Sequence, residues 1–141
     1  MKYVLDSSVA FKWVVVEALT DKARRLRDEF RQGLHEWIAP DVFPIEVAHA
    51  LTRAERQGRI NPPEASILLA DVLLTCPRLH VYVSSLSHAV AISSQARVGV
   101  YDCLYVVLAQ REGCEFLTAD DRLIRVLQPS YPFITALSSL P

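Results

Sequence analysis

Two aspartates follow short apolar segments that have the character of buried strands. Asp6 comes directly after Tyr3–Leu5, and Asp120 comes shortly after Glu115–Leu117. A buried carboxylate without a partner is costly, so a helix cap, a cation or further carboxylates around a metal must compensate it. In an open parallel sheet, the functional crevice lies at the carboxyl ends of the strands. Both aspartates are therefore predicted to lie at one edge of the sheet.

Two further acids stand in predicted helices. Asp102 begins one predicted helix, and Glu46 lies in the second turn of another, between apolar neighbours. Taken alone, each of the three aspartates has a simpler explanation as a helix N-cap, for which Asp is a favoured residue. Glu46 lies beyond the cap position, so that explanation does not cover it. The four acids together indicate a shared site more strongly than any one of them does.

Four carboxylates brought together repel one another, and their pKa values rise unless a cation neutralises them. Oxygen ligands without His or Cys suit Mg²⁺ or Mn²⁺, which keep several waters and bind phosphate oxygens. A second ion about 3.5–4 Å from the first could stabilise the leaving oxygen. The set therefore predicts hydrolysis of a phosphodiester bond by a metal-activated water. No Ser-His-Asp or Cys-His arrangement has comparable support.

The composition is typical of one folded domain. The chain has 141 residues, of which 51% are hydrophobic, so residues 1–141 suffice for a single domain with one core. The formal net charge of −1 neither indicates nor excludes a nucleic-acid partner, because local patches can outweigh the total. The three cysteines form no CxxC pair, which favours free thiols in a reducing cytoplasm. No apolar run approaches the roughly 20 residues of a membrane helix, so a soluble, cytoplasmic protein is expected.

Short apolar segments alternate with longer helical segments along the chain. The predicted strands are Tyr3–Leu5, Trp37–Ala39, His80–Val83, Glu115–Leu117 and Pro132–Thr135. The predicted helices run approximately over residues 7–16, 20–32, 41–57, 64–75, 85–97, 102–111 and 120–128. This alternation is typical of an α/β domain with a short-stranded, mostly parallel central sheet flanked by helices.

Each of the four acids lies in a distinct block of sequence, and along the chain these blocks are VLDSSVAFKW, PIEVAHAL, YDCLYVVLA and FLTADDRL. Together they resemble the PIN-domain family, and more narrowly the VapC toxins of toxin–antitoxin pairs, over nearly the whole chain. The resemblance implies a PIN-like three-layer fold. It implies that the metal-binding, catalytic acids are Asp6, Glu46, Asp102 and Asp120. It also implies that Ser8 and Thr118 orient a carboxylate or a water beside the first and last of these acids.

The resemblance implies a Mg²⁺- or Mn²⁺-dependent endoribonuclease that is the toxin of a VapBC-type pair. The expected partners are an RNA substrate, a cognate antitoxin and a second copy of the chain in a homodimer. Two alternatives stay open: a PIN nuclease of RNA processing without an antitoxin, and a catalytically inactive PIN-like binding module. All four acids are present, which favours an enzyme. An aspartate-nucleophile phosphatase is disfavoured because Ser8 stands where that chemistry needs a second Asp.

Three positions depart from the family's pattern. His49 stands where the family often has Asn, and Val14–Val16 replace a segment that often carries Phe and Pro. Asp121 adds an acid beside Asp120. Asp120 fits the family's TAD pattern better, so Asp121 is retained only as a candidate fifth metal ligand.

Arginines supply candidate contacts for RNA phosphates or an antitoxin. One set falls at helical spacing: Arg24, Arg27 and Arg31. For this set a solvated helix face with ion pairs is the favoured explanation. Arg53 lies about two turns beyond Glu46 on the same predicted helix, which places it within reach of a bound strand.

Aromatic residues are weighed in the same way. Phe11 and Trp13 could stack on a base, but their apolar neighbours favour packing in the core or in a dimer. Tyr101 and Tyr105 flank Asp102, and one of their hydroxyls could reach the site.

Overall fold

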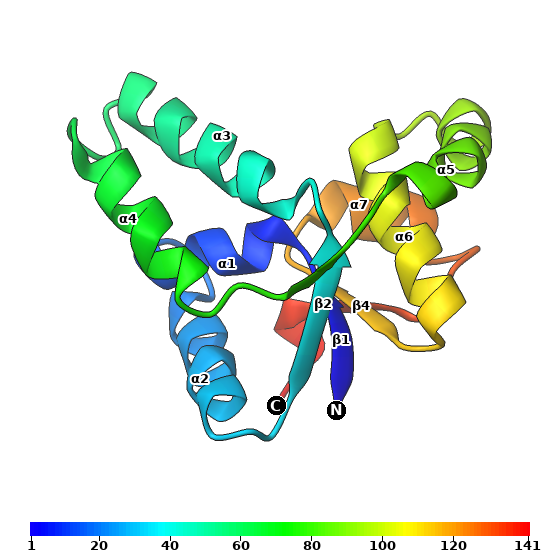
Figure 1. Ribbon diagram of the computed structural model, residues 1–141, viewed down its shortest axis with the longest axis horizontal. Helices are drawn as coiled ribbons and strands as arrows, with labels where there is room; N and C mark the ends of the chain where they lie inside the picture. Colours follow the sequence, from blue (N-terminus) through cyan, green and yellow to red (C-terminus); the bar gives the residue numbers. More distant parts are fainter.

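Five short strands form one sheet, and seven α-helices flank it (Figure 1). The computed structural model describes all residues from 1 to 141. The strands are β1 (Lys2–Leu5), β2 (Glu36–Pro40), β3 (Arg78–His80), β4 (Glu115–Thr118) and β5 (Ile134–Ala136). The helices are α1 (Ser7–Val14), α2 (Thr20–Arg31), α3 (Phe43–Arg56), α4 (Glu64–Leu73), α5 (Val83–Ala96), α6 (Val100–Glu112) and α7 (Asp121–Leu127), with a 3-10 turn at Leu137–Ser139.

The sheet has the order β3-β2-β1-β4-β5, and every neighbouring pair is parallel. The chain builds β1, β2 and β3 outward in one direction and then places β4 on the other side of β1. The strand order thus reverses between β1 and β4, which is where open α/β sheets bind their ligands. Because Leu5 pairs with Leu117, the next residues, Asp6 and Thr118, come side by side at this point.

The helices form two layers around the sheet. Helices α1 to α4 pack on one another in one layer, whereas α5, α6 and α7 lie on the other side (Figure 1). Helix α6 runs between the sheet and α5, and residues Cys103–Ala109 are all buried. A helix buried on every side must be apolar all round, which explains why this segment shows no polar face. The predicted three-layer, parallel α/β architecture is confirmed.

Two helices begin at other residues than predicted. Val42, and not Asp41, is the N-cap of α3, and the Asp41 carboxylate accepts a hydrogen bond from the Tyr82 backbone amide at 3.1 Å instead. Gly99 is the N-cap of α6, so Asp102 lies inside its first turn and does not cap it. The cap explanation for Asp102 is therefore wrong.

The third strand lies earlier than predicted, at Arg78–His80 instead of His80–Val83. Its parallel register with β2 ends at His80, and α5 begins at Val83. Val81 and Val83 are β-branched, which favours a strand, but they are 69% and 63% exposed and pack against no partner strand. No helix of the fold is long and apolar enough to cross a membrane.

Candidate active site

Asp6 is the most buried of the four acids, with 5% of its surface exposed. One carboxylate oxygen, Oδ2, accepts hydrogen bonds from Ser8 Oγ and from Thr118 Oγ1, each at 2.7 Å. Asp6 stands at the N-cap position of α1, but its side chain caps no backbone amide there. The cap explanation fails for this residue, whose carboxylate is held by hydroxyl groups at the junction of β1 and β4.

Ser8 and Thr118 tie the two strand ends together. Besides bonding Asp6, Ser8 Oγ accepts a hydrogen bond from the Ala119 amide at 3.0 Å. Thr118 is fully buried, and its Oγ1 accepts a hydrogen bond from the Asp120 amide at 3.1 Å. Both hydroxyls therefore lie next to the acids, where the sequence predicts them.

Asp120 both caps a helix and lines the site. Its Oδ1 accepts a hydrogen bond from the Leu123 amide at 3.1 Å, so it does cap α7. This contact uses one carboxylate oxygen, and Asp120 also lines a cleft together with Asp6 and Asp102. The cap explanation is correct for Asp120, yet it leaves the second oxygen available to the site.

Glu46 lies in the first turn of α3 and not in the second as predicted, because the helix begins at Phe43. Tyr105 reaches it from α6. The Tyr105 hydroxyl donates a hydrogen bond to Glu46 Oε1 at 2.6 Å. Tyr105 is fully buried, and its ring stacks on Phe116 of β4 at 5.5 Å between centroids. The expectation that one tyrosine hydroxyl reaches the site is met by Tyr105. Since Tyr105 is fixed by the core, it holds Glu46 in one orientation.

Burial and mutual repulsion disfavour the charges of these acids. Burial is the largest cause that raises the pKa of Glu46 to about 7. The hydrogen bond from Tyr105 lowers this pKa, and the charges of Asp6 and Asp102 raise it. Burial likewise raises the pKa of Asp102 to about 7, with added repulsion from Asp6 and Asp120. The pKa of Asp6 is also raised, chiefly by burial. Asp6, Glu46 and Asp102 are therefore each sensitive to the charge of another acid in the set.

Three of the four acids, Asp6, Asp102 and Asp120, line a cleft of about 390 Å³, and the cations Lys12 and Arg53 line it too. Glu46 lines a different hollow. Arg53 is exposed and makes no ion pair within the chain. The placement of Arg53 beside the acids agrees with the sequence, while its role as an RNA or antitoxin contact stays a prediction.

The cleft also contains a pair of residues that sequence reasoning missed. Lys12 Nζ contacts Glu17 Oε1 at 2.9 Å and is largely buried, and Arg59 contacts the other Glu17 oxygen at 2.9 Å. Both Lys12 and Glu17 line the cleft. A signal was present in the sequence, because a single lysine inside the apolar run VAFKWVVV must find a partner if it is buried.

The donor set fits a divalent cation by its chemistry. It offers carboxylate oxygens, and burial followed by repulsion between the acids raises the pKa values of Asp6, Glu46 and Asp102. A cation bound among them would stabilise their charged forms. No group of three acids stands close enough to form a ready-made set of ligands around one ion. Mg²⁺ commonly takes one or two protein carboxylates and keeps several waters, so such a preformed set is not required. The identity of the metal ligands remains a prediction.

Other candidate residues lie outside the acid set. The side chain of Asp121 is exposed and does not line the cleft. Trp13 is 3% exposed and stacks on Trp37 in the core, as expected. Phe11 lines the cleft, but the guanidinium of Arg59 lies over its ring at 5.5 Å from the centroid.

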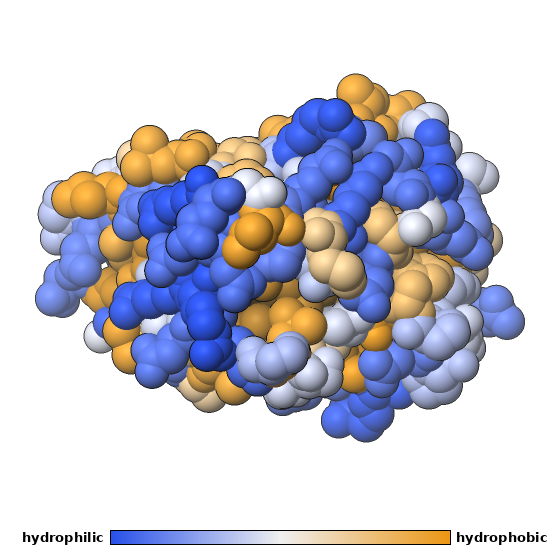
Figure 2. Space-filling model, turned by 90° about the horizontal axis from the view of Figure 1, so that it is seen from below, coloured by the Kyte–Doolittle hydropathy of each residue, from blue (hydrophilic) through white to orange (hydrophobic).

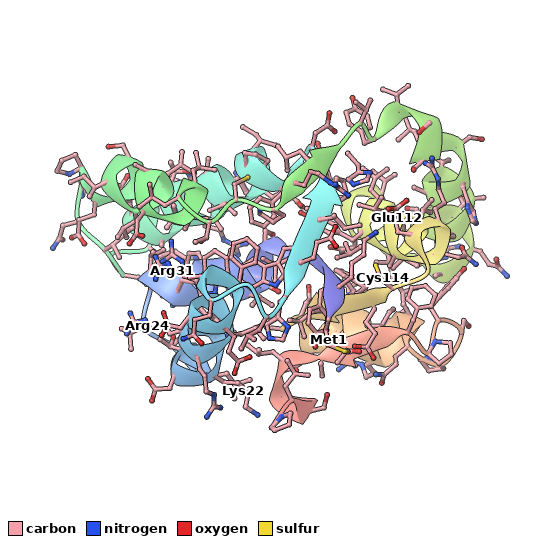
Figure 3. The ribbon with its side chains drawn as sticks, turned by 60° about the horizontal axis from the view of Figure 1, so that its bottom comes forward. Met1, Lys22, Arg24, Arg31, Glu112 and Cys114 are labelled. Carbon is pink, nitrogen blue, oxygen red and sulfur yellow. The ribbon has the colours of Figure 1, made fainter.

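The arginines of α2 do not line the acid cleft. Figure 3 shows Arg24 and Arg31 on this helix. Arg31 forms an exposed ion pair with Asp28 at 3.4 Å, which agrees with the prediction of a solvated helix face. Arg27 is a correction, because it is buried and forms an ion pair with Asp71 at 3.0 Å. It stabilises the contact between α2 and α4 and is not a solvated side chain.

The acid cleft lies at the carboxyl ends of β1 and β4. The two chain termini lie at the opposite ends of these strands (Figure 1). Figure 2 views the end where the termini lie, and polar residues cover much of that face, with apolar patches between them. The candidate active-site residues that line the cleft therefore lie at the carboxyl edge of the sheet.

Known proteins resemble this chain in sequence and in fold. The Ribonuclease VapC3 of Pyrobaculum aerophilum is 33% identical over 125 residues, which span 87% of this chain and 92% of that protein. The Ribonuclease VapC1 of Mycobacterium tuberculosis is 32% identical over 129 residues, spanning 84% of this chain and 90% of that protein. The crystal structure of PAE2754 from Pyrobaculum aerophilum superimposes with a TM-score of 0.69 at 20% identity, covering 99% of this chain and 94% of the other, and so supports the fold.

The family model of the PIN domain matches residues 3–127, which include all four acids and both hydroxyl residues of the site. With this match and the two VapC relatives, the chain belongs to the PIN-domain family and, within it, to the VapC type.

Proposed function

We propose that this protein is a divalent-cation-dependent endoribonuclease and the toxin of a VapBC-type toxin–antitoxin pair. The observation that carries the proposal is the cleft lined by Asp6, Asp102 and Asp120 where the strand order reverses between β1 and β4. Glu46 lines a second hollow, close enough for the charges of Asp6 and Asp102 to raise its pKa. Burial and repulsion disfavour the charged forms of Asp6, Glu46 and Asp102, which a bound cation would stabilise. Membership of the VapC type, whose relatives are named ribonucleases, favours RNA as the substrate.

Asp6, Glu46, Asp102 and Asp120 would hold Mg²⁺ or Mn²⁺. When bound, such an ion supplies Lewis acidity toward a phosphate oxygen and lowers the pKa of water. Ser8 and Thr118 orient the Asp6 carboxylate, and Tyr105 orients Glu46. These donors keep the acids from turning away from one another.

Arg53 provides the charge that the RNA backbone needs at the entrance of the cleft. Its guanidinium is exposed and unpaired, so binding a phosphate costs it no existing ion pair. Lys12 is different, because Glu17 already neutralises it. Arg53 therefore positions the strand, and the acids act on the bond.

A protein antitoxin and a second copy of the chain are the proposed partners, in the cytoplasm. An arginine of an antitoxin would be attracted to the acid cleft for the same reason as a cation. For the homodimer, α4 and its end expose Ile67 and Leu74, which are 62% and 78% exposed. Apolar side chains of this size on one helix are suited to packing against another copy.

The chemistry of the RNA ends tests the proposal. Purified protein is incubated with a labelled RNA and Mn²⁺, and the products are treated with an exonuclease that requires a 5′-phosphate. Cleavage by an activated water predicts 5′-phosphate and 3′-hydroxyl ends. Products with 2′,3′-cyclic phosphates would contradict the proposed chemistry, because they arise from attack by the RNA's own 2′-hydroxyl. Growth arrest on expression, relieved by co-expression of a cognate antitoxin, tests the toxin role separately.

A further inference from the structure

A second hollow adjoins the acid cleft and differs from it in chemistry. It has a volume of about 740 Å³, and its lining consists of Ser7, Ile45, Glu46, Ala48, His49, Thr52 and Tyr101. Ser7 lines both hollows, and Glu46 is one of the four acids, so the two meet at the candidate active site. We propose that this hollow binds a nucleobase of the RNA beside the bond that is cleaved, with Tyr101 as its stacking face. This inference rests on the proposed function.

Tyr101 is the aromatic side chain best placed to stack on a base. It is 53% exposed, more than any other aromatic residue of the chain, and Tyr82 follows at 36%. The tryptophans are buried, and the ring of Phe11 is covered by Arg59. An exposed aromatic face next to a nuclease site is the feature that single-stranded RNA uses for stacking.

The two hollows differ in charge, so they suit different parts of a nucleotide. No Lys or Arg lines the second hollow, and its nearest cation contact is a hydrogen bond of 3.4 Å from Arg56 Nη1 to the Thr52 hydroxyl. Lys12 and Arg53, in contrast, line the acid cleft. A phosphate is therefore favoured in the cleft, and an uncharged group is favoured in the hollow. Ile45, which is 65% exposed, adds an apolar wall beside Tyr101. A flat, uncharged base with an apolar face and polar edges fits this combination.

His49 and Thr52 are the groups that would read the edge of the base. They follow Glu46 at successive intervals of three residues on α3, so all three lie along one side of the helix. The Thr52 hydroxyl donates to the His49 backbone carbonyl at 3.1 Å and accepts from Arg56 Nη1 at 3.4 Å, so Thr52 has less freedom than His49. The His49 ring makes no hydrogen bond within the chain. His49 is exposed and free to donate to or accept from a base edge. We assign His49 to base preference and Tyr101 to base affinity.

Fluorescence anisotropy tests the inference without relying on cleavage. The probes are labelled ribo-octamers of A, C, G and U and an octamer of abasic ribose phosphates, which keeps the backbone charge. Binding to the wild-type chain is measured with Ca²⁺, and a gel confirms that the RNA stays intact. At least one homo-octamer should bind roughly 5- to 100-fold more tightly than the abasic octamer. Tyr101→Ala should remove that advantage and leave binding of the abasic octamer unchanged.

Two further variants sharpen the result. Tyr101→Phe keeps the aromatic ring and should bind as the wild type does, and Tyr82→Ala removes an exposed ring away from the hollow and should also have no effect. His49→Ala should change the order of preference among the four homo-octamers more than it changes abasic binding.

Four outcomes would overturn the base site. Tyr101→Ala could weaken both kinds of octamer equally, or weaken neither, or change only the molar mass in light scattering, which would assign the hollow to a second copy. All homo-octamers could also bind no more tightly than the abasic one. Complete absence of RNA binding by the wild type would contradict the proposed function itself, and the base site with it, so the two failures can be told apart.

Discussion

The hydroxyl of Tyr105 donates a hydrogen bond to Glu46 Oε1 at 2.6 Å, and this bond joins α6 to α3 across 59 positions of sequence. Tyr105 is anchored in the core by its stack on Phe116, whereas Glu46 lies at the edge of the hollow. The bond therefore fixes the Glu46 carboxylate relative to the buried helix α6.

Tyr105→Phe tests this positioning role. The ring and its stack remain, but Glu46 loses its donor, so we expect divalent-cation affinity and RNA cleavage each to fall about 10- to 100-fold. Calorimetric titration with Mn²⁺ gives the affinity, and Tyr131→Phe serves as the control at a tyrosine away from the acids. Unchanged Mn²⁺ affinity in a folded Tyr105→Phe protein would show that the bond does not position the site.

The acids should make the metal-free protein less stable as the pH rises. The carboxyl pKa values of Glu46 and Asp102 rise from 4.5 and 3.8 to about 7, mainly through burial, so between about pH 4 and 7 the folded state holds protons that the unfolded state has lost. The free energy of unfolding in EDTA should therefore fall across this range, by on the order of 1 kcal/mol or more between pH 5 and pH 8. Urea denaturation at the two pH values measures this change.

Asp102→Asn is the matched control for that measurement. The amide removes one titrating group and its repulsion of the other acids, so the variant should be more stable than the wild type at pH 8 in EDTA and less dependent on pH. Mg²⁺ should stabilise the wild type at pH 8 more than the variant. Identical pH dependence in the two proteins would mean that the Asp102 carboxyl does not contribute to the loss of stability at high pH.

The hydroxyl of Thr118 should matter for folding as well as for the site. It is fully buried, donates to Asp6 and accepts from the Asp120 amide. Thr118→Val keeps the shape, but it leaves the Asp120 amide without this acceptor and leaves Asp6 Oδ2 with Ser8 as its only hydroxyl donor. The free energy of unfolding should therefore fall by about 1–3 kcal/mol. Thr118→Ser keeps the hydroxyl and should lose less than half as much. Equal losses in chemical denaturation would attribute the effect to packing alone.

Arg53 should act on RNA binding more than on the chemical step. Arg53→Ala should raise KM with little change in kcat and should reduce the salt dependence of RNA binding by about one counterion. Arg31→Ala removes a cation of α2 that pairs only with Asp28, and it should leave both quantities unchanged. A fall in kcat with unaltered KM would instead place Arg53 at the reacting phosphate.

The sequence predicted the parallel sheet and the strand ends that carry Asp6 and Asp120, because buried strands produce apolar runs and the acids interrupt them. Helix starts were less predictable. Asp41 and Asp102 have the residue type of an N-cap, but tertiary contacts decide the matter: Asp41 binds the Tyr82 amide, and α6 begins at Val100. Residue type alone cannot reveal which of several nearby residues caps a helix.

The sequence predicted that the acids and the two hydroxyls lie near one another, and their roles stay a prediction. The supporting contacts were not predictable. The hydrogen bond from Tyr105 to Glu46 joins distant segments, and no local pattern distinguishes it from an ordinary buried tyrosine. Arg27 shows the opposite error, because its helical spacing suggested a solvated face and its partner, Asp71, lies on another helix. Long-range pairs of this kind depend on the packing of the layers.

The most direct test of the account is the rate of RNA cleavage by the purified, antitoxin-free protein in EDTA, Mg²⁺ and Mn²⁺, beside Asp6→Asn and Asp102→Asn. The account predicts cleavage only with a divalent cation, and a loss of several orders of magnitude in each variant while circular dichroism shows the fold intact. Cleavage in EDTA, or cleavage at the wild-type rate by either folded variant, would contradict the claim that these carboxylates form a cation-dependent nuclease site.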